Sequence, residues 1–302
     1  MLRHMHRRIA VGVVATLVAS FAVMTSGAYA GTITVPTAVP SSLTAGAATS
    51  YTIDFLTSSS GALTAGTSTI TLTGPAGTQF PPLDSEYTVN GTPVALTPSV
   101  TPGAVTITTP VLVSSSTAVE VVAGIGPTAT NPTAAGTYSI SVSTSSDPTP
   151  VASNPTYTIV AGAPSQDVVT GGGSQLTTVG TAFTNPLSAT IEDSHGNPVL
   201  VGGTTVTFTA PASGASGTFL NGTDTDSTTT NTSGVATTTP FTANTTAATY
   251  SVIGSSAGAA QATFSETNVA GAATQVVPTA GSGQSTPVGT AFATTLSSTG
   301  HL

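Results

Sequence analysis

The sequence predicts an all-β, secreted protein built from Ig-like β-sandwich domains. Short runs that alternate Thr or Ser with Val, Ile or Tyr recur between Gly- and Pro-containing turns, which is typical of sandwich strands. Charged residues make up only 5% of the 302 residues, and strong helix formers are sparse after residue 30. In addition, residues 160–188 recur at residues 269–297, which indicates a repeated unit.

The distribution of charge excludes two classes of partner. The cationic residues Arg3, Arg7 and Arg8 all lie at the N-terminus, whereas every Asp and Glu lies beyond Tyr51. A chain without its first residues is therefore acidic and has no Lys or Arg to neutralise phosphate. We expect no nucleic-acid partner and no binding to an anionic membrane surface. The sequence also has no Cys, which excludes disulfides and an anchor attached through a Cys.

Residues 1–30 are predicted to be a signal peptide. A basic start is followed by the apolar run Ile9–Met24 and then by small residues ending in the A-x-A cleavage signature at Ala28 and Ala30. The apolar run is slightly short for an uncleaved membrane anchor, which is the alternative interpretation. Because the residues around Arg7-Arg8 match the twin-arginine pattern poorly, we expect export by the general secretory route to the cell surface or the medium.

Residues 31–159 are predicted to form a first β-sandwich domain of generic Ig-like type. The dipeptide Asn90-Gly91 predicts a tight hairpin. The Pro-containing segments at 80–82 and 148–150 are expected to be loops. The expected strands are 51–55, 68–73, 87–89, 94–96, 105–108, 118–122, 138–142 and 157–159.

Residues 160–268 are predicted to form a second domain around the segment Leu187–Val199. Its turn, Asp193-Ser194-His195-Gly196-Asn197, is followed in order by the strand 206–208, the turn 232–236, and the strands 248–252 and 262–265. In this order the motifs resemble the bacterial Ig-like domain of group 1 (Big-1), found in the invasin and intimin family. The resemblance implies Ig-like modules that stack as rods and hold a distal domain away from the cell. The match departs from the family pattern at 200–203.

Residues 269–302 are predicted to be the truncated start of a further Ig-like repeat. The match to the second domain runs without a gap and stops after Ser297. Since a single strand does not bury an apolar face alone, two explanations remain open: a disordered tail, or the opening of a longer array. The fidelity of the copy favours the longer array.

The sequence contains no constellation of residues that predicts catalysis, and we expect a protein that is not an enzyme. His195 occupies a turn, where an exposed structural residue is expected, and Asp193 is expected to cap that turn through an Asx-type hydrogen bond. Two acidic pairs in predicted loops are candidates for calcium binding, and the sequence indicates no other metal or cofactor. Full calcium-loop patterns are absent, however, which favours solvated carboxylates. The pairs are Asp84 with Glu86 and Asp224 with Asp226.

The predicted function is that of a non-catalytic structural or adhesion protein, secreted or on the cell surface, whose Ig-like domains act as a stalk or spacer. The expected partners are neighbouring Ig-like repeats, the cell envelope, other surface proteins or glycans. One alternative is an extracellular module that binds carbohydrate or protein, although the sequence has no Trp and few Tyr to form an aromatic platform. Another is the N-terminal part of a larger secreted enzyme.

Overall fold

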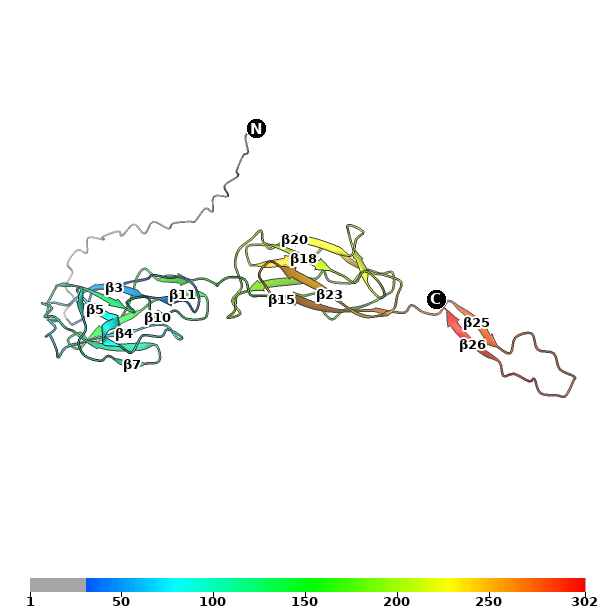
Figure 1. Ribbon diagram of the computed structural model, residues 1–302, viewed down its shortest axis with the longest axis horizontal. Helices are drawn as coiled ribbons and strands as arrows, with labels where there is room; N and C mark the ends of the chain where they lie inside the picture. The colour runs from blue at the N-terminus through cyan, green and yellow to red at the C-terminus, as the bar shows by residue number, and fades with distance from the viewer. Residues whose placement is uncertain (1–30, 302) are drawn as a thin grey trace, which may run out of the picture.

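The computed structural model describes residues 31–301, and their regular structure is β-strand apart from one short 3-10 helix, η1 (Asp84–Glu86). The predicted all-β class is therefore confirmed. Two β-sandwich domains follow one another along the long axis of the molecule, and a separate hairpin follows them (Figure 1). No helix in this part of the chain is long and apolar enough to cross a membrane. The predicted signal peptide, residues 1–30, lies outside the described residues.

The first domain packs two five-stranded sheets against each other. One sheet has the order β1 (Thr37–Pro40), β3 (Tyr51–Leu56), β9 (Ala118–Ala123), β5 (Tyr87–Val89) and β6 (Thr92–Pro93). The other has the order β13 (Val151–Ala152), β12 (Ser141–Thr144), β4 (Thr69–Thr73), β8 (Ala104–Thr108) and β7 (Ser99–Thr101). Two short pairs complete the domain: β2 (Ala48–Thr49) with β10 (Ala129–Thr130), and β11 (Gly136–Tyr138) with β14 (Tyr157–Ile159).

The first domain corrects two of the expected strands. The expected strand 138–142 is two strands, because the chain leaves β11 in one pair and enters β12 in the large sheet. At this crossing Ile140 is fully buried, which explains why the alternating pattern continues without a visible break. The hairpin at Asn90-Gly91 forms as expected, with both residues at positive φ, but its second strand is Thr92–Pro93 rather than residues 94–96.

The second domain is also a sandwich. One sheet has the order β15 (Gln166–Gly171), β17 (Ser188–Glu192) and β21 (Val235–Thr237). The other has the order β16 (Leu176–Thr178), β24 (Ala262–Val269), β23 (Ala248–Ser256), β18 (Thr205–Thr209) and β20 (Thr225–Thr229). A short pair, β19 (Gly217–Phe219) with β22 (Phe241–Ala243), closes one end.

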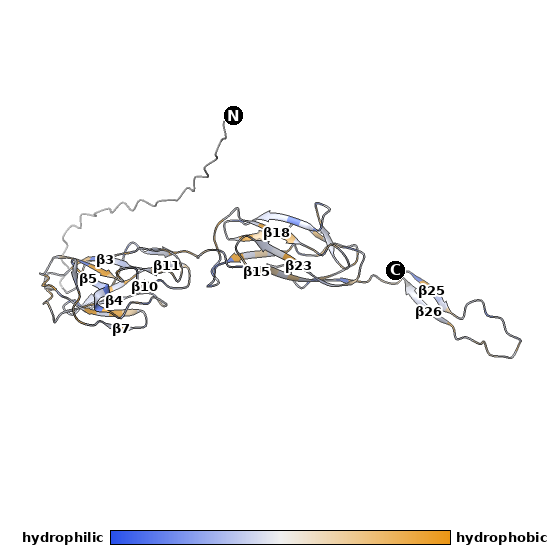
Figure 2. Ribbon diagram, in the orientation of Figure 1, coloured by the Kyte–Doolittle hydropathy of each residue, from blue (hydrophilic) through white to orange (hydrophobic). Residues whose placement is uncertain are grey.

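Each domain has a hydrophobic core of its own. The first core is built around Tyr51, Phe55 and Tyr87, and the second around Phe208 and Phe264. No residue belongs to both cores, and hydrophobic positions recur along the strands of each domain (Figure 2). Alternation along the strands sends Thr and Ser to the opposite face, as in β24, whose residues alternate between buried and exposed. The separate cores indicate that each sandwich is stabilised largely by its own packing.

The last described residues form a two-stranded hairpin, β25 (Gln275–Ala280) with β26 (Ser297–His301). Its pairing reproduces that of β15 with β17 position for position, including a bulge at the same place. Its apolar residues are nevertheless exposed: Phe292 is 60% exposed, whereas the matching Phe183 in the second domain is 6% exposed. The hairpin therefore has the backbone of the start of a module without a module's core.

Candidate functional site at the domain junction

The turn after β17 lies where the two domains meet, and its backbone is organised by one carboxylate. Asp193 Oδ1 accepts hydrogen bonds from the backbone N–H groups of His195 (2.8 Å) and Asn197 (2.9 Å). The backbone of Asp193 also pairs with Asn197, through a 2.9 Å bond from Asp193 N to Asn197 O. Gly196 has φ +79°, a conformation that favours glycine. The sequence Asp-x-x-Gly-Asn thus folds locally into a tight Asx-type turn.

Asn197 connects this turn to the first domain. Its Nδ2 donates to the backbone oxygen of Thr133 at 2.8 Å, and its Oδ1 accepts from the backbone N–H of Ala135 at 2.8 Å. The side chain of Asn197 therefore makes two hydrogen bonds across the junction, both to main-chain groups of one loop. The side chain is 8% exposed, and Nδ2 also lies 2.9 Å from Asp193 Oδ2, so its orientation is fixed by both domains.

The linker joins the same network. Val160 pairs with the first domain, since its N–H donates to Leu43 O at 2.8 Å and its carbonyl accepts from Ala45 N at 2.9 Å. Two residues later, Gly162 N donates to Asp193 Oδ2 at 2.8 Å. The connecting segment thus leaves the first domain as a hydrogen-bonded strand end and is immediately bound by the second domain. A linker with both ends bonded in this way restricts the angle between the domains.

A close steric contact lies beside these hydrogen bonds. Gly46 has φ +64°, and a Cβ placed on it would come within 2.6 Å of the imidazole ring of His195. The ring therefore packs directly against the glycine backbone, and no other residue type fits there without displacing it. His195 itself is largely exposed, as expected for a turn residue, and its ring lies against the first domain.

The loop of the first domain that receives Asn197 is held in place by Asn131. Asn131 Nδ2 donates to the carbonyls of Ser42 (2.8 Å) and Thr44 (3.0 Å), and its Oδ1 accepts from the hydroxyl of Tyr51 at 2.7 Å. Both Asn131 and Tyr51 are fully buried. The receiving surface is thus positioned from the core of the first domain outward.

The hydrogen bonds at the junction determine the ionisation of Asp193. Burial of the carboxyl opposes its charge, but the N–H groups of Gly162, Asn197 and His195 outweigh burial and lower the pKa of Asp193 to about 2. Asp193 is 1% exposed, and residues 31–301 contain no Lys or Arg, so N–H dipoles stabilise its charge. This arrangement suits a structural joint, because both carboxylate oxygens of Asp193 are bound by N–H groups of the protein.

The acidic pairs that were candidates for calcium lie in different settings, and Asp224 is half-exposed in the turn just before β20 (Thr225–Thr229). Asp84 and Glu86 belong to η1, where Glu86 Oε2 accepts a hydrogen bond from Leu83 N. Asp226 lies in strand β20 and is 8% exposed, and its Oδ2 accepts from the N–H (2.7 Å) and the hydroxyl (2.9 Å) of Thr239. The expectation of a solvated loop carboxylate is therefore wrong for Asp226.

Calcium binding at these pairs stays a prediction, with two carboxylates available at each. Within residues 31–301 there is no group of three or more His, Asp or Glu side chains that would hold a metal ion.

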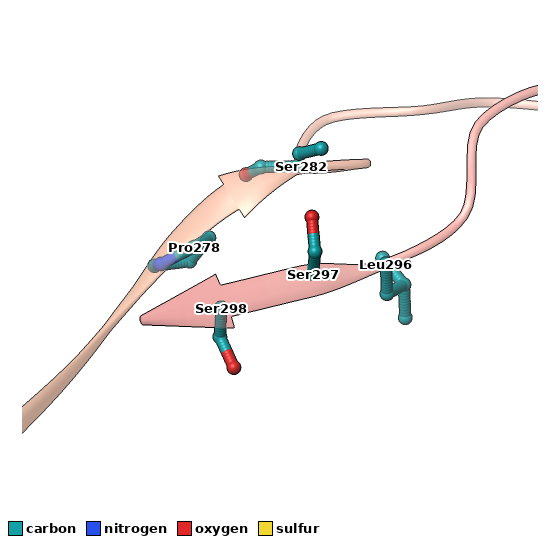
Figure 3. A pocket seen from close by; sticks show the side chains of 6 residues that line it. Pro278, Ser282, Leu296, Ser297 and Ser298 are labelled. Atoms are coloured by element: carbon teal, nitrogen blue, oxygen red, sulfur yellow. The ribbon is translucent and has the colours of Figure 1, made fainter. Parts of the chain in front are cut away.

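A hollow of about 320 Å³ lies beside the C-terminal hairpin and has no ionisable side chain in its lining (Figure 3). Ser297 and Ser298 direct their hydroxyls to opposite sides of β26 there. In the repeat register Leu296 corresponds to Leu187, which is fully buried in the second domain. Leu296 therefore lines an open hollow, whereas its counterpart Leu187 is enclosed by the core of the second domain.

One buried acid of the second domain was not anticipated from the sequence. Glu266 lies on β24 and is fully buried, and its Oε2 accepts a hydrogen bond from Gln175 N at 3.2 Å while Oε1 has no partner. Burial raises the pKa of Glu266 to about 7, and the single hydrogen bond only partly opposes this. Side chains alternate along β24 so that position 266 faces the core. This alternation is the sequence signal from which the burial of Glu266 could have been predicted.

Comparison with known proteins gives distant structural likeness only. No family model matches the chain, and no curated protein matches it. Similar solved structures include InvD of Yersinia pseudotuberculosis, at 17% identity and a TM-score of 0.39, covering 84% of this chain and 61% of that chain. The Escherichia coli adhesin FdeC is similar at 15% identity and a TM-score of 0.35, over 81% of this chain and 67% of that chain. The D0-D1 domain of intimin is similar at 15% identity and a TM-score of 0.23, over 78% of this chain and 97% of that chain.

The chain thus spans less than two thirds of the length of InvD. At these identities and TM-scores the likeness assigns neither a family nor a function.

Replacing Asn197 by Ala is expected to weaken the junction. The change removes both hydrogen bonds to the first domain, and we expect the free energy of unfolding of the second domain to fall by about 1–2 kcal/mol. We also expect faster hydrogen exchange at the Ala135 amide, which loses its acceptor. Urea titration and amide exchange measure the two effects. The control is Asn231→Ala, whose Oδ1 accepts only from Ser233 N and Val235 N within its own domain. An unchanged Ala135 exchange rate in Asn197→Ala would contradict the assignment.

The stability of the second domain is expected to depend on pH in two directions. The pKa of Glu266 is raised in the folded domain, so the folded state favours the protonated carboxyl. The stability that Glu266 contributes is therefore complete below about pH 4.5 and is lost as the pH rises towards 7. Because the pKa of Asp193 is lowered, its contribution is complete above about pH 4 and is lost as the pH falls towards 2. Urea unfolding across pH 2–8 should therefore show a maximum near pH 4–5. Glu266→Gln should remove the decline above the maximum, and a decline that persists in this variant would contradict its cause.

Proposed function

We propose that this chain is an extracellular spacer whose Ig-like domains are held end to end by a hydrogen-bonded junction. The observation that supports this most directly is the position of Asn197, which links the turn after β17 to the backbone of Thr133 and Ala135 in the neighbouring domain. A joint that fixes the angle between two sandwiches is useful to a protein that must span a distance. Within such a protein, the chain serves a structural or adhesive role without catalysis.

The chemistry of the junction also suits an extracellular setting. Its described contacts include hydrogen bonds and the packing of the His195 ring on Gly46, and no Lys or Arg of residues 31–301 is available for an ion pair there. Ion pairs weaken as salt increases, whereas hydrogen bonds between buried polar groups depend little on ionic strength. The joint is therefore expected to keep its geometry across the range of salt concentrations met outside a cell.

The proposal includes export and a modular layout. Residues 1–30 direct the chain through the general secretory route and are removed after Ala30. Residues 31–159 and 160–268 are then the two modules, and residues 269–302 begin a third. The separate cores support the first two units, and the hairpin β25–β26 supports the third.

The surface of the described residues favours a spacer over a carbohydrate-binding module. Among their exposed large hydrophobic residues, Phe292 is the single aromatic one, and it lies on the C-terminal hairpin segment. Flat sugar-binding surfaces depend on exposed aromatic rings. The partners proposed for the spacer are therefore neighbouring modules, the cell envelope and other surface proteins.

Small-angle X-ray scattering on residues 31–302 tests the spacer directly. We expect an extended particle whose maximum dimension is the same in 0.1 M and 1 M NaCl, because no ion pair contributes to the junction. The matched variant combines Asp193→Ala with Asn197→Ala and is expected to give a broader, on average shorter, distribution of distances. The proposal fails if the unmodified chain is as compact or as variable as this double variant.

A further inference from the structure

Glu266 differs from the other buried acids of the second domain in how few groups bind it. Its Oε2 accepts one hydrogen bond, from Gln175 N at 3.2 Å, and its Oε1 has no partner. Asp167, Asp193 and Asp226 each accept at least two hydrogen bonds. Glu266 is also fully buried, and residues 31–301 contain no Lys or Arg. Ionisation inside the closed domain therefore leaves a charge that no cation balances and that too few donors solvate.

The two strands beside β24 cover Glu266 unequally. β23 pairs with β24 over seven residues, whereas β16 pairs with it over three. We call residues 174–179, which carry β16, the β16 limb; none of them is fully buried, and Leu176 is 70% exposed. Backbone hydrogen bonds hold this limb on β24, from Ser174 N to Ser265 O (2.8 Å) and from Thr267 N to Gln175 O (3.0 Å). The β16 limb is thus the part of the cover that separates with the smallest loss of buried contacts.

Glycines lie at both ends of the β16 limb. Residues 171–173 are three consecutive glycines, and Gly180, at φ +75°, follows the limb. Such positions absorb backbone rotation at little steric cost. The chain beyond Gly180 is anchored separately, because Phe183 is 6% exposed and its ring stacks on Phe241 with centroids 5.5 Å apart. The limb is therefore able to separate from β24 while the core of the domain stays packed.

The C-terminal hairpin shows the same limb without a partner strand. Residues 283–288 correspond to the β16 limb in the repeat, and they form no strand. The loop is held instead by Gln284, whose Nε2 donates to Gly281 O at 2.9 Å and to Thr294 O at 2.7 Å. Gln175 makes the corresponding bonds in the second domain. An unpaired limb is thus a conformation that a closely similar sequence adopts in the same molecule.

We propose that Glu266 and the β16 limb form a proton-controlled latch on the second domain. While the carboxyl is protonated, the limb stays paired with β24 and excludes water from Glu266. When the carboxyl ionises, the limb separates at its glycine ends and water solvates both carboxylate oxygens. β24 then becomes the outer strand of its sheet, with unpaired backbone groups along its edge.

The elements packed against β24 leave Glu266 as the group that titrates. Tyr250 on β23 lies directly opposite Glu266, and its hydroxyl donates to Asn268; burial and the nearby Glu266 raise the pKa of Tyr250 above its usual range. Asp167 on β15 has both carboxylate oxygens bound by Ser256, and β16 has no titratable residue. Burial raises the pKa of Glu266 to about 7 in the closed domain. The latch is therefore closed below about pH 4.5 and opens as the pH rises towards 7.

Amide hydrogen exchange of residues 31–302 between pH 5 and pH 8 tests the latch. After correction for the intrinsic exchange rate, we expect the protection of Ser174 and Thr267 to fall by about tenfold per pH unit up to about pH 7, because each opening releases one proton. The reference is Thr230 in the same domain, whose N–H donates to Thr204 O at 2.9 Å and whose protection should stay constant. If Thr230 loses protection in parallel with Thr267, the whole domain unfolds and the latch proposal fails.

Two substitutions of the same kind identify the responsible carboxyl. Glu266→Gln removes the ionisation, so the protection of Ser174 and Thr267 should no longer depend on pH. The matched control is Glu192→Gln on β17, which should leave the pH dependence of both amides unchanged. A pH dependence that persists in Glu266→Gln, or none in the unmodified chain, overturns the proposal.

The comparison of Thr267 with Thr230 in the unmodified chain decides the question even if Glu266→Gln does not fold. The spacer proposal is independent of either result, because the latch includes none of the residues that bond across the domain junction.

Discussion

The arrangement of this protein depends on how a buried carboxylate is stabilised without a cation. Asp193 is 1% exposed, and its charge is balanced by N–H groups from its own turn and from the linker. Each of these bonds fixes a different segment: the bonds to His195 and Asn197 close the turn, and the bond to Gly162 binds the linker to it. The closed turn then presents Asn197 to the first domain. Ionisation, turn shape and domain contact are consequently parts of one hydrogen-bonded unit.

The same solution recurs elsewhere in the chain. Asp147, Asp167 and Asp226 are buried, and each accepts both a backbone N–H and a hydroxyl from one Ser or Thr on another segment. For Asp147 and Asp167 the partners, Ser58 and Ser256, lie 89 residues away in sequence. A chain that has no Lys or Arg after residue 8 and is rich in Ser and Thr thus joins distant segments with paired hydrogen bonds. This explains how an acidic protein of low charge content forms compact sandwiches without salt bridges.

The sequence allowed us to predict features that depend on residues close together in the chain. It did not allow us to predict contacts that form only when strands pair or domains pack. Alternation predicted strands such as β3, β4, β18 and β24, and Asn90-Gly91 predicted its hairpin, because both signals lie within a few residues. The split at Ile140 was missed because alternation continues through the crossing between sheets. Asp226 was expected to be a solvated loop residue. Its hydrogen-bond partner Thr239 is 13 residues away in sequence and comes near it only when the strands pair, so no sequence signal indicated this bond. The hydrogen bonds of Asn197 to Thr133 and Ala135 were not predicted for the same reason, because these residues come together only when the two domains pack.

The distance between the two domains, measured by pulsed electron paramagnetic resonance, tests the junction most directly. The chain has no Cys, so spin labels are placed uniquely through Ser99→Cys on β7 and Thr209→Cys on β18, both exposed. A hydrogen-bonded junction predicts one narrow distance distribution, which broadens when Asp193→Ala and Asn197→Ala are added. A distribution that is already broad in the otherwise unmodified chain would contradict the account.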